Sequence, residues 1–195
     1  MNCSSDCAPE GGKYFNSPRK DEPVSEELQA LITRAGQLNP PILLDPTLSF
    51  EYRIPAAGLG YWNAKRPADG RLPPRSAVNP AELAKYLPAL ALIDVSENEN
   101  GGIELFSRLA GAEVERVFGM MSRQDLRKRL PPEIFARWQI IFRALWVAEA
   151  PLRITSRIAY EDKTYLYIEC LFAPLANSDP NSITSLIFAE FRMDS

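Results

Sequence analysis

The sequence contains no histidine, and this absence excludes several kinds of functional site. Ser-His-Asp and Cys-His catalysis need an imidazole to carry a proton, and two-histidine metal centres need it as a ligand. Haem held by a histidine is excluded for the same reason, which leaves Cys170 or a methionine as the remaining kind of haem ligand. Gly-x-Gly-x-x-Gly and phosphate-loop motifs are also absent, so the identity of any cofactor stays unknown.

Cysteine is scarce as well. Three cysteines in 195 residues are too few for a disulfide framework. Cys3 and Cys7 have no second cysteine pair and no histidine to complete a zinc site, so we expect no metal and interpret both as free thiols. Cys170 falls in a predicted strand, where it is interpreted as a small core residue.

The patterns of membrane and nucleic-acid proteins are missing too. No apolar run approaches the roughly 20 residues that span a bilayer, and residues 1–7 do not resemble a signal peptide, so we expect a cytoplasmic protein with no membrane partner. A net charge of -3 and a pI near 5.2 provide no broad positive field for phosphate backbones. The basic cluster at 123–129 is interrupted by Asp125 and favours a solvated helix face, so nucleic acid is not expected as a partner.

What is present is the composition of one globular domain with an N-terminal extension. Apolar residues make up 46% of the chain and charged residues 24%, and this length suits a single core. Residues 1–23 are rich in small and charged residues and predict a flexible tail. Residues 24–54 predict a helix capped by Ser25, followed by an extended connector, and residues 55–195 predict the folded domain.

Within residues 55–195 the pattern predicts a strand pair, then helices, then three strands. The strongest helix signal follows Pro131-Pro132, where apolar side chains recur at i, i+3, i+4 and i+7. The last part of the chain alternates with a period of two, which is typical of strands with one buried face. The predicted elements are helices at 55–66 and 80–86, strands at 89–95 and 103–110, helices at 112–118, 122–130 and 132–149, and strands at 152–160, 164–175 and 182–193.

The opening part of this domain resembles a bacterial family of PAS-like domains. The resemblance lies in Tyr61-Trp62, the Leu72-Pro73-x-Arg75 turn, Asn79-Pro80, Leu87-Pro88 and Asp94, and it covers roughly residues 55–193. The sequence departs from the family pattern after Gly119. The resemblance implies an α+β fold, in which a PAS-like five-stranded antiparallel sheet carries helices on one face, cups a cavity, and is preceded by N-terminal helices.

Six residues are candidates for lining a ligand pocket. Inward-facing strand positions carry polar or thiol groups, the central helix contributes one aromatic ring, and the Leu-Pro-x-Arg turn contributes one arginine: Ser107, Ser156, Cys170, Ser185, Phe142 and Arg75. A buried hydroxyl without a partner costs about 1–3 kcal/mol, so each serine either bonds locally to backbone or faces a polar ligand. Arg75 either forms a surface ion pair with Asp94 or binds a carboxylate in bidentate fashion.

The resemblance favours a sensory or regulatory domain over an enzyme. Such a domain binds a small ligand or a partner protein and signals through another polypeptide, and a homodimer through the helix at 25–35 or an exposed sheet face is a further expectation.

Two alternatives stay open. The first is a small cone-shaped α+β enzyme, with Asp94 or Glu169 as a base and Tyr160 or Tyr167 as an acid. The second is a ligand-free protein-protein adaptor. A filled interior would favour the adaptor, and an open cavity lined by the serines would favour the ligand sensor.

Overall fold

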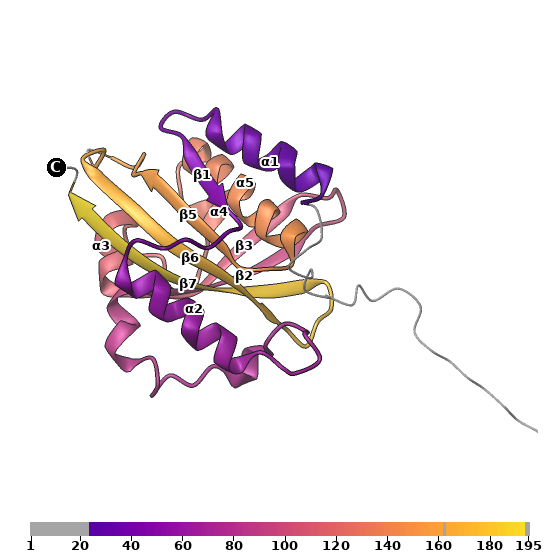
Figure 1. Cartoon of the computed structure of the whole chain (residues 1–195). Helices are drawn as coiled ribbons and strands as arrows, with labels where there is room; N and C mark the ends of the chain where they lie inside the picture. The colour runs from indigo at the N-terminus through magenta and orange to yellow at the C-terminus, as the bar shows by residue number, and fades with distance from the viewer. Residues whose placement is uncertain (1–23, 162, 194–195) are drawn as a thin grey trace, which may run out of the picture.

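A computed structural model describes residues 24–161 and 163–193, and within these residues one antiparallel sheet organises the chain. The order of strands across the sheet is β1-β5-β6-β7-β2-β3-β4. The strands are β1 (Ile42–Asp45), β2 (Leu90–Glu97), β3 (Ile103–Ala110), β4 (Gln124–Asp125), β5 (Leu152–Arg157), β6 (Leu166–Ala176) and β7 (Ser182–Met193). Figure 1 shows the long strands β6 and β7 side by side near the middle of the sheet.

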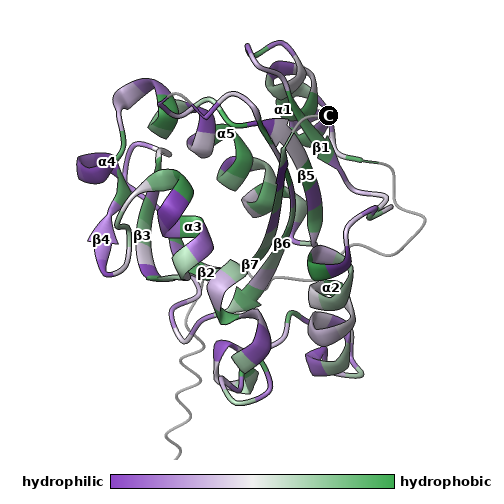
Figure 2. Cartoon of the chain, turned by 90° about the vertical axis from the view of Figure 1, so that its left-hand side faces the viewer, coloured by the Kyte–Doolittle hydropathy of each residue, from purple (hydrophilic) through white to green (hydrophobic). Residues whose placement is uncertain are grey.

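Helices cover both faces of this sheet. The helices are α1 (Glu26–Gly36), α2 (Arg53–Lys65), α3 (Ala112–Phe118), α4 (Leu126–Arg129) and α5 (Pro132–Ala148), with 3₁₀ turns η1 (Arg75–Ala77) and η2 (Ala84–Ala89). Figure 2 shows β6 and β7 between α5 on one side and α2 on the other. We call the face toward α3 and α5 the inner face, and the face toward α2 the outer face.

The central strand β2 explains how two covered faces follow from sequence. Its residues Leu90 to Ile93 are all buried, and it pairs with β3 on one side and β7 on the other. A continuous apolar run suits a strand buried on both faces, because successive side chains point in opposite directions. On the outer face, α2 approaches so closely that a Cβ on Gly58 would lie 2.5 Å from the Phe188 ring.

The first helix packs on the rest of the domain. Ser25 caps it by accepting a hydrogen bond from the backbone N–H of Leu28 at 3.2 Å, as its sequence predicts. Leu28 and Ala35 are buried, and α1 lies along α5 and β1. Arg143 of α5 binds Glu27 at 2.9 Å. The apolar side of α1 is therefore used within the chain.

The expected α+β class and PAS-like antiparallel sheet are confirmed. Strands β5, β6, β7, β2 and β3 are the predicted five, and α3 and α5, which connect the hairpin to the last three strands, lie on the inner face as expected. The sheet has more strands than expected, because a short strand, β1 or β4, is added at each edge. The helix that precedes the hairpin, α2, covers the outer face instead.

Both added strands come from segments with a different prediction. The connector contributes β1, where Ile42 and Leu44 are buried against the domain and the register pairs Ile42 with Ser156 of β5. The predicted helix at 122–130 begins as β4, which pairs with Phe106 and Ser107 of β3. Only afterwards does Asp125 cap α4, by accepting a hydrogen bond from the N–H of Arg127 at 3.0 Å.

The predicted short helix at 80–86 is also different. That segment forms turns followed by η2, which contains Pro88. The segment's backbone N–H groups bond three residues back, as from Glu82 to Asn79 at 3.2 Å and from Tyr86 to Leu83 at 2.8 Å, which is the pattern of turns and 3₁₀ helix.

Candidate functional site

A pocket of about 90 Å³ lies between the inner face of the sheet and helices α3 and α5. Isoleucine is the commonest residue in its walls, and Ile93, Ile154, Ile168 and Ile187 come from four different strands. The alternation of each strand places these side chains on the same face, because residues two apart point the same way. The pocket is therefore a direct product of strand periodicity in the core.

Helix α5 forms the opposite wall. Ile134, Trp138 and Ile141 lie at i, i+4 and i+7 and face the pocket. The helix begins at Pro132, which suits the first helical turn because its missing N–H has no intrahelical role there.

Four aromatic rings form another part of the pocket wall. The ring of Trp138 lies 5.2 Å from that of Phe118, which in turn lies 6.0 Å from Tyr160 and 6.4 Å from Phe191. All four residues line the pocket. Tilted and edge-on ring pairs of this kind are favourable beyond their burial, so this wall is well defined.

One end of the pocket is polar. Ser156, Arg157 and Arg137 line it there, beside the segment 39–41 that leads into β1. Ser156 donates its hydroxyl to the Pro41 carbonyl at 2.8 Å, and Arg137 donates to the carbonyls of Asn39 at 3.2 Å and Pro40 at 2.6 Å. Burial lowers the pKa of Arg137, because the guanidinium loses hydration.

The structure brings three of the six candidate residues to the pocket or its immediate wall. Ser156 and Cys170 line it. Phe142 lies one layer behind, fully buried, with its ring 6.1 Å from Trp138 and 5.3 Å from Phe172. Burial raises the pKa of the Cys170 thiol, so this cysteine stays protonated at neutral pH.

Two candidate serines lie beside the pocket instead of in its lining. Ser107 of β3 and Ser185 of β7 are both register partners of Ile93, so the three residues form a row across the inner face. Both serine side chains are fully buried, and neither hydroxyl has a hydrogen-bond partner. Of the three serines, only Ser156 shows the local bonding to backbone that the sequence allowed.

Arg75 is not brought to the pocket. It lies half-buried in η1, and the pocket lining does not include it. Asp94, the partner considered for it, binds Arg108 on the neighbouring strand and accepts a hydrogen bond from the Thr184 hydroxyl at 2.8 Å. The acidic side chain is thus engaged within the sheet itself.

Sequence reasoning missed the polar end of the pocket. Arg137 directly precedes Trp138 in the strongest helix signal of the chain, so the sequence does show a cation beside the apolar face of this helix. The hydrogen-bond partners of Arg137 could not be predicted, since Asn39 and Pro40 lie 98 and 97 residues earlier in the chain.

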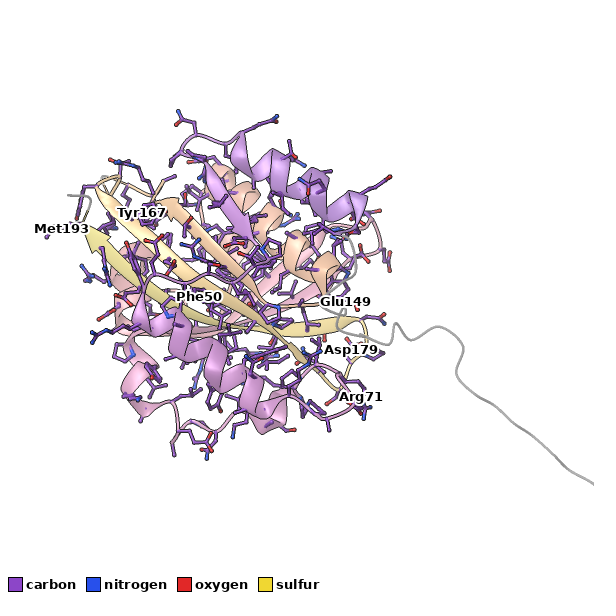
Figure 3. All side chains as sticks on the ribbon, viewed as in Figure 1. Phe50, Arg71, Glu149, Tyr167, Asp179 and Met193 are labelled. Carbon is purple, nitrogen blue, oxygen red and sulfur yellow. The ribbon has the colours of Figure 1, made fainter. Side chains whose placement is uncertain are left out.

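The outer face is organised around a buried carboxylate. Glu169 of β6 is 1% exposed and accepts hydrogen bonds from Arg153 Nε at 2.6 Å and from the backbone N–H of Tyr52 at 2.6 Å and Glu51 at 3.1 Å. The segment between β1 and α2 crosses the sheet here (Figure 1), and Figure 3 labels Phe50 on it. Glu169 thereby holds the start of α2, whose N-cap residue Tyr52 makes no side-chain cap.

This arrangement separates the residues considered for an enzyme. Glu169 and Asp94 face the outer side of the sheet, and Tyr167 shares that side because it lies two residues from Glu169. Tyr160 alone lines the inner pocket. No proposed carboxylate therefore reaches the pocket to act as a base there.

The antiparallel sheet and the helices over its inner face border a small apolar pocket and define an α+β domain. The chain belongs to the PAS domain family, whose sequence pattern matches residues 55–188. The match begins in α2 and ends in β7, so it includes most of the pocket. No curated protein matches the chain.

Within residues 24–161 and 163–193, no helix has the length and hydropathy to cross a membrane. In the same part of the chain, no three acidic, cysteine or histidine side chains gather in a way that could hold a metal ion. Cys3 and Cys7, interpreted as free thiols, lie outside the described residues.

Proposed function

We propose that this protein is a PAS sensory or regulatory domain that holds a small apolar ligand in its inner-face pocket and signals through another polypeptide. The observation that carries the proposal is the apolar pocket between the sheet and α5. Ligand sites are typically concave and mostly apolar, with a few placed polar groups, and this pocket has that composition.

The size of the pocket limits the ligand. Its volume of about 90 Å³ lies far below the roughly 300–1,000 Å³ of pockets for drug-sized molecules. A haem or flavin is much larger than this space. The proposed ligand is therefore a short branched chain or a compound of similar bulk.

The packing of α5 offers a route from ligand to output. Trp138 and Ile141 face the pocket, while the same helix packs against α1 and binds Glu27 through Arg143. A ligand that shifts α5 thus acts on α1 as well. The partner protein, a homodimer and the cytoplasmic location stay predictions.

The other two functions receive less support. The enzyme needs a carboxylate in the pocket, and Glu169 and Asp94 are engaged on the outer face. The adaptor needs no pocket at all. An apolar pocket costs its walls van der Waals contacts, which supports a ligand site over an adaptor.

Xenon binding tests the pocket independently of ligand identity, because xenon enters dry apolar cavities. Methyl NMR spectra of the protein under xenon pressure should show shifts for Ile93 and Ile141, which line the pocket. Ala189→Val should remove these shifts, because Ala189 also lines the pocket and two added methyl groups fill part of it. Native mass spectrometry of freshly purified protein should show a retained small molecule.

The matched control is Ala30→Val, the same change at an exposed position of α1. It should leave the xenon shifts intact. Absence of xenon shifts in the wild-type protein, together with a bare polypeptide mass, would contradict the ligand sensor and favour the adaptor.

A further inference from the structure

The polar end of the pocket contains a cation without an acidic partner. Arg137 is half-buried, and its hydrogen bonds go to the carbonyl oxygens of Asn39 and Pro40. Among the described residues no carboxylate pairs with it, and Glu133, one turn earlier on α5, does not reach it. Burial alone accounts for the lowered pKa of Arg137.

Two other sheltered arginines, Arg143 and Arg153, are neutralised. Arg143, on the same helix, binds Glu27 at 2.9 Å and Glu97 at 2.5 Å. Arg153 binds Glu169 at 2.6 Å and Asp45 at 3.4 Å. A sheltered charge without a partner is unfavourable, because burial removes hydration and nothing replaces it. In the described part of the chain Arg137 has no such partner, and unlike the half-buried Arg75 and Arg129, which also lack one, it lines the pocket.

The chemistry of the guanidinium indicates what would complete the site. A guanidinium carries five N–H donors in a planar fork, and carbonyl oxygens take two of those of Arg137. A carboxylate matches the fork and neutralises the charge, and such charge-assisted hydrogen bonds are about twice as strong as neutral ones. Ser156 and Arg157 lie at the same end and add polarity there.

We infer that the ligand of this pocket is a small apolar monocarboxylate, with its hydrocarbon part among the isoleucines and its carboxylate at Arg137. This inference rests on the proposed function, because it names the class of ligand for the same pocket. The hydrocarbon part is short, since the pocket measures about 90 Å³, below the roughly 150 Å³ of an engineered cavity that binds benzene.

A set of probes with one shape and different charges tests the inference. We would titrate the full chain with 3-methylbutanoate, 3-methylbutan-1-ol and 3-methylbutylammonium, and follow the methyl signals of Ile93 and Ile141. The carboxylate should bind at least about tenfold more tightly than the alcohol, and the ammonium most weakly. In Arg137→Gln the preference for carboxylate over alcohol should disappear, while the affinity for the alcohol stays the same.

Arg116→Gln is the matched control, because Arg116 is exposed on α3, another helix of the pocket, and the change removes the same charge. It should retain the preference. If Arg137→Gln does not fold, Arg137→Lys keeps the charge and loses the fork, and it should retain part of the preference.

The outcomes separate the ligand class from the pocket itself. Equal affinity for alcohol and carboxylate, or unchanged carboxylate affinity in Arg137→Gln, would overturn the inference while xenon shifts still support the proposed function. A failure of both xenon and carboxylate to shift the methyl signals would overturn both.

Discussion

The two faces of the sheet use the same strands for opposite purposes. On β6, Ile168, Cys170 and Phe172 face the inner pocket, whereas Glu169, between them, joins a hydrogen-bonded network on the outer face. The inner face is apolar and incompletely filled. The outer face holds charge that is fully engaged. Period-two alternation thus builds a hydrogen-bonded charged face and an apolar face with a pocket from one set of strands.

Removing the outer-face carboxylate Glu169 should cause the largest loss of stability. Glu169→Ala should lower the free energy of unfolding by about 3–5 kcal/mol, because it leaves Arg153 buried without its nearest acidic partner. Chemical denaturation measures this effect. Glu113→Ala, an exposed change on α3, should alter stability by less than about 0.5 kcal/mol. A loss below about 1 kcal/mol in Glu169→Ala would show that the Glu169 network contributes little to stability.

The close contact of α2 with the outer face provides the next largest effect. Gly58→Ala should destabilise the protein by about 1–3 kcal/mol, because its Cβ would lie 2.5 Å from the Phe188 ring. Gly60→Ala on the same helix meets nothing within 4 Å, and it should stabilise by about 0.5–1 kcal/mol. Thermal denaturation of both variants measures the difference. Changes of the same sign would contradict the packing of α2.

On the inner face, the effect of losing a hydroxyl should depend on whether that hydroxyl has a hydrogen-bond partner. Ser185→Ala should stabilise the protein by up to about 1 kcal/mol, because its buried hydroxyl has no hydrogen-bond partner. Ser156→Ala should instead destabilise by about 0.5–1.5 kcal/mol, since its hydroxyl bonds to the Pro41 carbonyl. Urea denaturation distinguishes them. Destabilisation by Ser185→Ala would show that its hydroxyl is satisfied in solution.

The smallest effect is the loss of stability at low pH through Asp45 and Glu190. Burial by itself would raise the pKa of Asp45 and Glu190, but hydrogen bonds from Thr47 and Arg153 to Asp45, and from the Ile54 N–H and Arg192 to Glu190, lower both below their ordinary values of 3.8 and 4.5. Their stabilisation is present above about pH 5 and lost as the pH falls through the lowered values. In the double variant Asp45→Asn/Glu190→Gln, the free energy of unfolding should fall less steeply between about pH 6 and 2 than in the wild-type protein. An unchanged slope would contradict this contribution.

Local patterns predicted most of the fold and little of the polar chemistry. The bounds of β3, α3 and β7 follow from alternation, helical spacing and flanking glycine, all of which are properties of neighbouring residues. Strands β1 and β4 were missed because they are short and form only through pairing with β5 and β3. The role of Arg137 depends on carbonyls 97 and 98 residues away.

The candidate pocket shows the same limit. Ser156 and Cys170 could be assigned to the inner face by alternation, and both line the pocket. Ser107 and Ser185 point the same way but lie beside the pocket. Alternation determines the side of the sheet on which a residue lies, whereas the position of a void depends on how α3 and α5 pack.

The proposed function requires that an apolar guest enter the inner face and not the outer face. Methyl NMR of the wild-type protein under xenon pressure tests it directly, because both faces report in one spectrum. The account predicts shifts for Ile93 and Ile141 at the pocket, and none for Leu171 and Leu186, which are fully buried on the outer face. Shifts of equal size on both faces, or none on either, would contradict it.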